Sequence, residues 1–420
     1  MRCALTLSNE QALPRRAPAV FAALRFRDFR LLWIGLLISN LGSWMQLTAM
    51  GYFVVKLAVK PELGPLYLGL IGAARAVPVI LCSPIAGVVA DTWPRRRVLY
   101  ATNITIALIA LILAIFTSLG RMNLWGLLVI SAVSSAAMSF DSPARQSWVP
   151  LLVDREYIGN AIGLNSVAFN APAVIGPAIA GFLIAHVSVA GSFYVNAAAT
   201  MAVVGALLLM RASPASSAKR EPLLRSIAGG LQFLYAHPIL RWVIAFFIVS
   251  ALLVRPYSSL LPAYALNDLH TNAQGFGWAL AATGIGGFGG ALVTAAFASR
   301  ESRSLIWFGS GLLMSLGVLA LGFTGSLAIA IPLLFLIGVC VLTFLGMSNT
   351  LIQMLSPDAV RGRAISVYTM IALGIVPGGS LIVGSLGSLI GLHLAFIISG
   401  ALCALVVAWL YLFKPIVRTV

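Results

Sequence analysis

The sequence predicts an all-α integral membrane protein with twelve transmembrane helices in two pseudo-symmetric six-helix bundles. Three observations support this fold class. First, 60% of the 420 residues are hydrophobic and 9% are charged, which is more apolar surface than a soluble domain of this length can bury. Second, apolar stretches recur along the chain near the ~20 residues that cross a hydrocarbon core of about 30 Å. Third, the basic residues lie almost wholly on one side of these stretches.

Charged and turn residues between the apolar stretches delimit the expected helices. The first six lie near 31–55, 65–90, 98–119, 124–152, 160–186 and 192–211. The second six lie near 241–264, 276–298, 304–323, 327–354, 364–390 and 393–413. The expected parts of the chain are an N-terminal cytoplasmic segment (1–30), an N-terminal bundle (31–211), a cytoplasmic central loop (212–240), a C-terminal bundle (241–413) and a cytoplasmic tail (414–420).

The 27 Lys and Arg residues predict the orientation of these helices. If the N-terminus is cytoplasmic, 21 of them fall on the cytoplasmic side, and only Lys56, Lys60 and Arg121 fall on the other side. Three more lie within expected spans: Arg75, Arg145 and Arg255. This asymmetry follows the positive-inside rule, so we expect both termini in the cytoplasm. The net charge of +16 is scattered among apolar segments, which argues against a nucleic-acid partner.

The second half of the chain echoes the first. The segment LLVDREYIGNAI (151–162) follows the fourth expected helix, and LSPDAVRGRAIS (355–366) follows the tenth. An offset of 204 residues aligns Asp154 with Asp358, which indicates the internal duplication common among secondary transporters. Between the halves, the spacing of LLRSIAGGLQFLYAH (223–237) predicts a short amphipathic helix on the membrane surface.

Charge is concentrated in GVVADTWPRRR (87–97), the turn between the second and third expected helices. One interpretation is a positive-inside anchor and nothing more. The spacing of Gly87, Asp91, Arg95 and Arg96, however, resembles the loop between helices two and three of the major facilitator superfamily. That resemblance implies that the loop is a cytoplasmic latch, in which these residues serve gating and do not bind substrate.

Other segments resemble the bacterial efflux branch that contains macrolide-efflux and enterobactin-exporter proteins. These are 142–183, around the fourth and fifth expected helices, and 229–241, in the central loop. Gly176, Pro177 and Gly181 resemble the antiporter motif of exporters. The resemblance implies a multi-pass protein of the bacterial inner membrane that exports a small molecule.

Ionisable side chains inside a membrane are costly and usually face a wet cavity or a partner. Asp141 is the one acidic residue well within an expected span, and Arg145 lies four residues later on the same helix face. One hypothesis is that Asp141 binds and releases the proton that drives export, because burial and a nearby Arg shift a carboxylate in opposite directions. The alternatives are a buried salt bridge, a cap on backbone groups freed by Pro143, or an incorrectly placed span end.

Arg75 and Arg255 also lie within expected spans, near helix-breaking prolines, and with Arg145 they are candidates to line a substrate cavity. If they face a central cavity, their guanidinium groups favour an anionic or carbonyl-rich substrate, whereas snorkelling to an interface is the alternative. Trp44, Gln46 and Tyr257, with Phe140 and Tyr264, are candidates to line an apolar pocket, although aromatic residues in spans more often pack or form interfacial belts.

The function that these features favour is secondary active export of a small amphipathic compound by proton antiport. A lysophospholipid or siderophore-like organic-anion transporter is the alternative, and a non-transporting membrane scaffold is a remote one. No Walker A pattern is present, which argues against ATP as the energy source, and no clustered nucleophile or filter-like loop favours an enzyme or a channel. We expect no cofactor. The four histidines do not predict a metal site, although His270 beside Asp268 could form a polar site on the outer side, and we expect a monomer.

Overall fold

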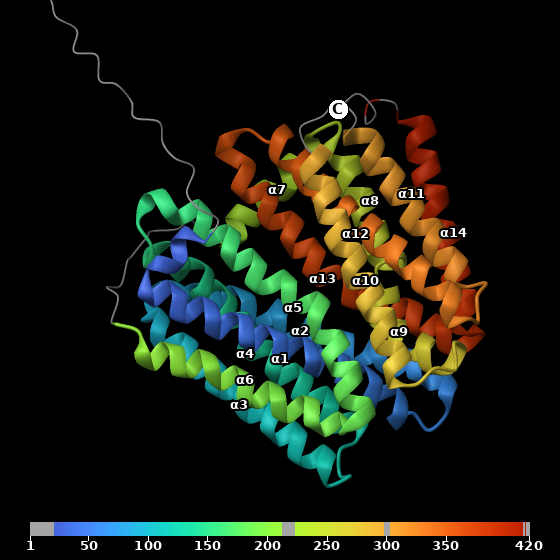
Figure 1. The fold of residues 1–420 in the computed structure, drawn as a ribbon. Coiled ribbons are helices and arrows are strands. Elements are labelled where there is room, and N and C mark those ends of the chain that lie inside the picture. The colour runs from blue at the N-terminus through green and yellow to red at the C-terminus, as the bar shows by residue number, and fades with distance from the viewer. Residues whose placement is uncertain (1–20, 212–222, 298–302, 415, 417–420) are drawn as a thin grey trace, which may run out of the picture.

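The computed structural model describes residues 21–211, 223–297, 303–414 and 416, which fold largely as helices (Figure 1). Within these ranges, twelve segments are long and apolar enough to cross a membrane, so the predicted fold class is confirmed. The N-terminal half contains α1 (Arg27–Leu57), α2 (Gly64–Thr92), α3 (Arg95–Ser118), α4 (Leu124–Trp148), α5 (Ile158–His186) and α6 (Val189–Leu209). Four 3₁₀ turns accompany them: η1 (Ala22–Arg25), η2 (Pro61–Leu63), η3 (Val149–Leu152) and η4 (Arg155–Tyr157).

The second half is also helical, with a broken first span. Its elements are α8 (Leu240–Leu253), α9 (Tyr257–Ala263), a π-helix, η5 (Tyr264–Asp268), α10 (Ala273–Phe297), α11 (Arg303–Leu321), α12 (Leu327–Leu355), α13 (Asp358–Ile390) and α14 (Leu392–Phe413). The sequence predicts one helix over 241–264, but α8 and α9 are separated at Pro256. Proline cannot donate the backbone hydrogen bond that would continue the helix, which explains the break.

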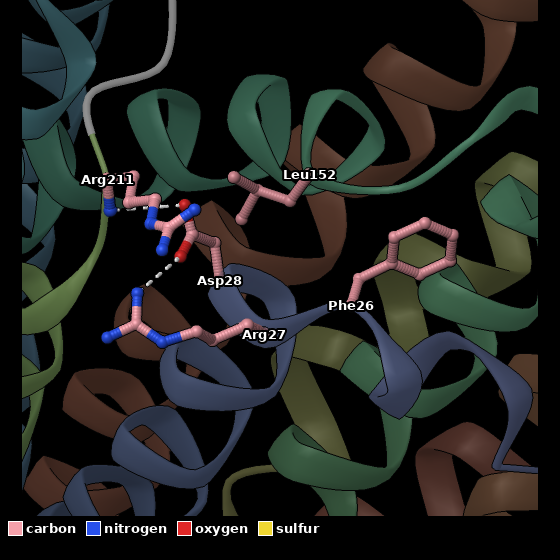
Figure 2. Close-up of a pocket in the computed structure, with 5 residues that line it drawn as sticks. All are labelled: Phe26, Arg27, Asp28, Leu152 and Arg211. Carbon is pink, nitrogen blue, oxygen red and sulfur yellow. Dashed lines mark hydrogen bonds and ion pairs between the residues drawn. The ribbon is translucent and has the colours of Figure 1, made fainter.

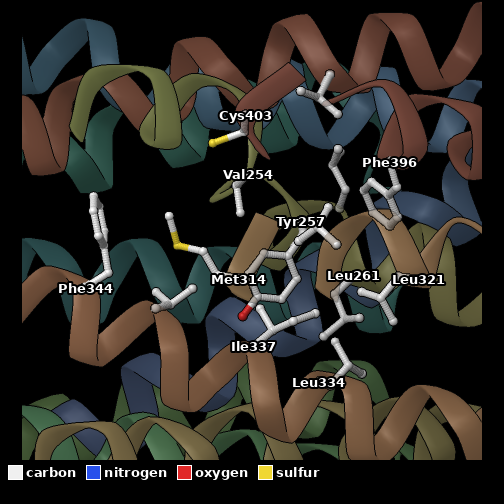
Figure 3. Packing of buried hydrophobic residues seen from close by; sticks show 14 of the residues in the cluster. Val254, Tyr257, Leu261, Met314, Leu321, Leu334, Ile337, Phe344, Phe396 and Cys403 are labelled. Atoms are coloured by element: carbon white, nitrogen blue, oxygen red, sulfur yellow. The ribbon is translucent and has the colours of Figure 1, made fainter. Parts of the chain in front are cut away.

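The buried apolar side chains form two cores, one confined to the N-terminal half and a larger one that continues from the C-terminal half into parts of α1 to α4 and α6. In the N-terminal half, α1 packs on α5 and α6, while α2 packs on α4. In the C-terminal half, α10 and α11 pack on α12, and α11 packs on α14. Figure 3 shows part of the second core, where side chains from α9, α11, α12 and α14 converge. These two groups of helices form the blue-to-green and yellow-to-red parts of Figure 1.

The two halves touch each other at one end of the molecule, which we call the closed end. There the first turns of α2 pack on the last turns of α13, and the end of α5 packs on the start of α10. A Cβ atom on Gly69 would lie 2.8 Å from Cα of Leu381, and one on Gly181 would lie 2.8 Å from Cα of Gly277. Glycine therefore allows backbone-to-backbone contact across the boundary at both places.

The same helix faces separate toward the opposite end, which we call the open end. Eleven residues make three helical turns, so Ile80 continues the α2 face of Gly69, and Phe288 continues the α10 face of Gly277. Ile80 is 60% exposed and Phe288 is 64% exposed. On α13, Met370 continues the face of Leu381 and is 45% exposed. Faces that touch at the closed end are thus uncovered farther along, so the two halves lie apart toward the open end.

The helix expected in the central loop is present as α7 (Leu223–Ala236). It packs on α13 at the open end, where a Cβ atom on Gly230 would lie 2.6 Å from the carbonyl oxygen of Arg363. Its position on a membrane surface stays a prediction, as do the domain boundaries expected from the sequence.

Candidate functional site

Arg75 lies on α2, between the closed-end contact and the exposed part of the helix. Three residues earlier on α2, a Cβ atom on Gly72 would lie 3.7 Å from Cα of Pro377 on α13. Arg75 continues this face and is exposed, so its side chain lies where the face that packs on the other half becomes uncovered. The inward-facing alternative proposed for Arg75 from the sequence is thus the one that its surroundings favour.

Arg255 lies at the break between α8 and α9. Its Nη1 atom donates a hydrogen bond of 3.2 Å to the carbonyl oxygen of Ala372 on α13. Tyr368, one helical turn before Ala372, is close enough to interact electrostatically with the guanidinium. The side chain is half-buried, so part of its donor capacity remains directed toward solvent.

Asp141 and Arg145 form a buried ion pair on α4, with Nη2 of Arg145 3.5 Å from Oδ2 of Asp141. The other carboxylate oxygen, Oδ1, accepts hydrogen bonds from Nδ2 of Asn103 at 2.7 Å and from Oγ1 of Thr102 at 3.2 Å. Both of these donors come from α3. Asp141 is 5% exposed and is the only buried acidic residue in the described part of the chain.

Arg145 extends this network to α5. Its guanidinium carbon lies 4.3 Å from the ring centroid of Phe169, a cation–π contact. The charged pair therefore lies where α3, α4 and α5 meet, about five turns along α4 from its start at the closed end. Of the structural alternatives, the geometry favours the buried salt bridge over a cap near Pro143.

The other predicted cavity residues have partners within one half. The Oε1 atom of Gln46 accepts a hydrogen bond of 2.7 Å from Nδ2 of Asn196 on α6. Tyr257 is 3% exposed and lies in the C-terminal core, beside Met314 and Ile337 (Figure 3). Trp44 is half-buried against α5, where a Cβ on Gly176 would lie 2.7 Å from the Cβ of Trp44. Their roles toward a substrate stay predictions, which the packing of Gln46 and Tyr257 does not support.

The antiporter-like motif on α5 has two structural roles. Gly176 brings α5 close to α1 within the N-terminal half, and Gly181 brings it close to α10 across the boundary. Pro177, between them, is buried. A change in the angle between the halves would therefore alter the contact that this motif makes with α10.

The family is decided by a match over nearly the entire chain. Residues 18–418 match the model of the transmembrane secretion effector family. The chain belongs to this family of the major facilitator superfamily. Its members are transporters and not enzymes, as the sequence predicts.

Relatives in the superfamily share about a quarter of their aligned residues with the chain. A transporter from Bacillus subtilis, YfiS, is 29% identical over 398 residues, covering 88% of this chain and 89% of YfiS. The multidrug efflux pump Tap of Mycolicibacterium fortuitum is 24% identical, with 78% and 82% covered. The enterobactin exporter EntS of Shigella boydii is 25% identical, with 90% and 87% covered.

A solved structure has the same fold. The inward-facing bacterial homologue of the human lysosomal transporter Spinster superposes with a TM-score of 0.73 at 15% identity, covering 92% of this chain and 96% of that one. The similarity supports the major facilitator fold of two six-helix bundles, which the sequence also predicts.

The superfamily loop between α2 and α3 is only partly described. Gly87 and Asp91 belong to α2, but their side chains lie outside the described residues. Nη2 of Arg96 donates to the carbonyl oxygen of Leu208 at the end of α6, at 3.4 Å, which anchors the loop within the N-terminal half. Arg95 begins α3. The latch function of this loop stays a prediction.

Sequence analysis missed a surface pocket of about 310 Å³ at the open end of this superfamily member, lined by Phe26, Arg27, Asp28, Leu152 and Arg211 (Figure 2). Asp28 accepts a hydrogen bond of 3.2 Å from the backbone nitrogen of Arg211 and lies 3.6 Å from Nη1 of Arg27. Residues 28 and 211 are far apart in sequence, and only the packing of α1 against α6 brings them together.

Proposed function

We propose that the chain exports a small amphipathic compound by alternating access, with protons moving in the opposite direction. The observation that carries this proposal is that the facing surfaces of the two halves meet through glycine contacts at one end and are exposed farther along, where Arg75 lies. We infer that a substrate-binding hollow lies between these exposed faces. The similarity to a multidrug efflux pump, Tap, and to an enterobactin exporter, EntS, supports outward transport of a drug-like or siderophore-like compound.

The open end is the cytoplasmic end in this proposal. It carries the α2–α3 turn and α7, whereas the closed end carries Lys56, Lys60 and Arg121. The positive-inside rule then gives an inward-open carrier with cytoplasmic termini in a bacterial inner membrane. A single chain contains both halves of the hollow, so a monomer is the functional unit.

Asp141 is the proton-binding group in this proposal. A proton on Asp141 would remove the charge that pairs with Arg145 and weaken the acceptor that receives Asn103. Both changes free α4 to move against α3 and α5, and α5 is one of the helices that close the opposite end. Proton binding can therefore alter the angle between the halves without direct contact with the substrate.

The two cavity arginines favour an anionic group on the substrate. Arg75 from the N-terminal half is exposed within the hollow, and Arg255 from the C-terminal half is half-buried at the α8–α9 break. A carboxylate or phosphate could bind the guanidinium group of either arginine by paired hydrogen bonds. An organic-anion or lysophospholipid transporter is thus the second candidate.

The test is uptake into inside-out vesicles under an imposed pH gradient, using hydrophobic drugs, lysophospholipids and acidic metabolites. We expect saturable uptake of at least one class of compound. Its initial rate should be at least about ten-fold lower in Asp141→Asn, because a neutral amide cannot bind the proton. Exchange of substrate without a gradient should persist.

Asp154→Asn is the matched control, because Asp154 is an exposed acidic residue in the α4–α5 connection of the same half. It should transport like the unmodified protein. Undiminished pH-driven uptake in Asp141→Asn would reject Asp141 as the coupling group, and a selective loss for anionic substrates in Arg75→Gln would favour the second candidate.

A further inference from the structure

Away from the hollow, two titratable side chains face each other at the closed end. His393 is the second residue of α14, and Asp268 is the last residue of the π-helix. Nε2 of His393 lies 3.3 Å from Oδ1 of Asp268. The other ring nitrogen, Nδ1, lies 3.0 Å from the carbonyl oxygen of Gly322, which follows α11. The imidazole therefore joins three elements of the C-terminal half.

Both ring nitrogens of His393 thus face oxygen atoms. A carbonyl and a carboxylate only accept hydrogen bonds, and a neutral imidazole has a single N–H to donate. One of the two contacts would then bring two acceptors together. An additional proton on the pair removes this conflict. We propose that Asp268 and His393 form a proton-binding site at the closed end.

Among the residues that the structure describes, no other charged group that packs on the pair replaces this proton. Tyr264, also on the π-helix, donates its hydroxyl to the carbonyl oxygens of Leu321 and Thr324. His270, the other imidazole near Asp268, is exposed. Lys60 and Glu62, on the α1–α2 connection that faces this region, are exposed as well.

Two hydrogen bonds that cross between the halves lie near the pair along the chain. Asn267, next to Asp268, donates from Nδ2 to the carbonyl oxygen of Pro61 at 2.9 Å. Ser388, near the end of α13 and five residues before His393, accepts from the backbone nitrogen of Leu66 at 3.1 Å.

The proton consequently acts on the closure of this end. With the proton bound, His393 links the π-helix to the α13–α14 turn. Asn267 and Ser388 then keep their hydrogen bonds to the α1–α2 connection at the same time. Without the proton, the acceptors repel and the two segments lose their link. Protonation of this site favours the closed end, and this effect is independent of Asp141 and of any substrate.

The first test follows histidine protonation in the full-length protein. Selective ¹⁵N-histidine labelling gives four side chains to observe: His186, His237, His270 and His393. His186, also at the closed end, bonds the carbonyl oxygen of Phe182 at 2.9 Å and serves as the internal control. At about pH 6 we expect both ring nitrogens of His393 to give the signals of protonated nitrogen, because both face acceptor oxygens.

Asp268→Asn should return one ring nitrogen of His393 to the signal of unprotonated nitrogen, because the asparagine amide can donate to Nε2 of a neutral imidazole. The signals of His186 should not change. An unprotonated ring nitrogen on His393 in the unmodified protein would overturn the proposal without recourse to any variant, and so would an Asp268→Asn protein whose His393 signals are unchanged.

The second test measures closure by hydrogen–deuterium exchange at about pH 6, with all proteins at the same pH. The amide of Leu66 should exchange at least about ten-fold faster in His393→Phe and Asp268→Ala, which remove the link altogether, than in the unmodified protein. His186→Gln should leave it unchanged. Equal exchange at Leu66 in all four proteins would disprove the link between the proton and the closed end, whatever the outcome of the transport assays.

Discussion

The carboxylate of Asp141 has partners on both oxygens, and Arg145 is the only charged one in the described structure. Removing one member of a buried ion pair leaves the other charge uncompensated. We therefore expect Arg145→Met to lower the free energy of unfolding by about 3–5 kcal/mol. Thermal or denaturant unfolding of the purified protein would measure this loss.

Two further variants make the measurement specific. Arg121→Met removes an exposed cation from the α3–α4 connection and should change stability by less than about 0.5 kcal/mol. The double variant Asp141→Asn with Arg145→Met removes both charges and should recover much of the lost stability. If the double variant is no more stable than Arg145→Met alone, the pair does not have the energetic role assigned to it.

His237 gives the stability of α8 a pH dependence. Its Nδ1 atom accepts hydrogen bonds of 3.3 Å from the backbone nitrogens of Ile239 and Leu240, at the start of the helix. Partial burial lowers the pKa of His237 below its ordinary value of 6.5. The neutral form is therefore favoured in the folded protein, and its contribution is present above pH 6.5 and is lost as the pH falls through the lowered value.

We expect His237→Ala to destabilise the start of α8 by about 1 kcal/mol at neutral pH, as loss of a helix cap does. The difference from the unmodified protein should disappear in acid. Exchange of the Leu240 amide across this pH range measures both effects, and a difference that grows toward acid pH would contradict them.

Sequence reasoning could identify Asp141 and Arg145 because both the rarity of charge and the spacing of four are visible in the chain. It could not identify Thr102 and Asn103, which meet Asp141 only through the packing of α3 on α4. Polar residues of this kind occur in many helices, and the sequence does not show which face of a helix meets its neighbour.

Among the elements, α5 has the most direct part in closing the molecule. Gly181 lies against the backbone of α10, so a larger side chain has no flexible neighbour to displace. Gly181→Val should prevent closure there and reduce initial transport rates at least about ten-fold, since one conformation of the cycle becomes inaccessible.

The matched substitution is Gly163→Val on the same helix, where an added Cβ atom has nothing within 4 Å. It tests the effect of a β-branched residue in α5 without the contact to α10. Equal loss of transport in the two variants would mean that the helix itself, and not the boundary, is sensitive.

The elements also show what periodicity cannot predict. Apolar composition identifies the seventh span as a whole, but the break at Pro256 and the π-helix at its end depend on local backbone geometry. The helix α7 is predictable because its polar and apolar residues alternate in helical register. Its contact with α13 through Gly230 is not, because nothing in the sequence specifies that partner.

For the molecule as a whole, the number of spans and the division into halves are predictable because the bilayer requires long apolar helices. The conformation is not. Whether the halves part at one end or the other depends on small differences between the contacts at the two ends, and a transporter must be able to adopt both. Ile80 and Phe288 are apolar residues whether or not they are covered, so the sequence does not show that they are exposed in this conformation.

The crowding of arginine at the open end gives the carrier two like-charged rims. Arg97 on one half and Arg241 on the other are both exposed there. Their repulsion extends about 30 Å at 0.01 M salt and about 10 Å at 0.1 M. Concentrated salt should thus let the rims approach, shortening the distance between spin labels at Val167→Cys and Phe288→Cys, with Cys3 and Cys82 replaced. If the distance between the labels stays constant or lengthens, repulsion between the arginines does not determine how far the halves lie apart at the open end.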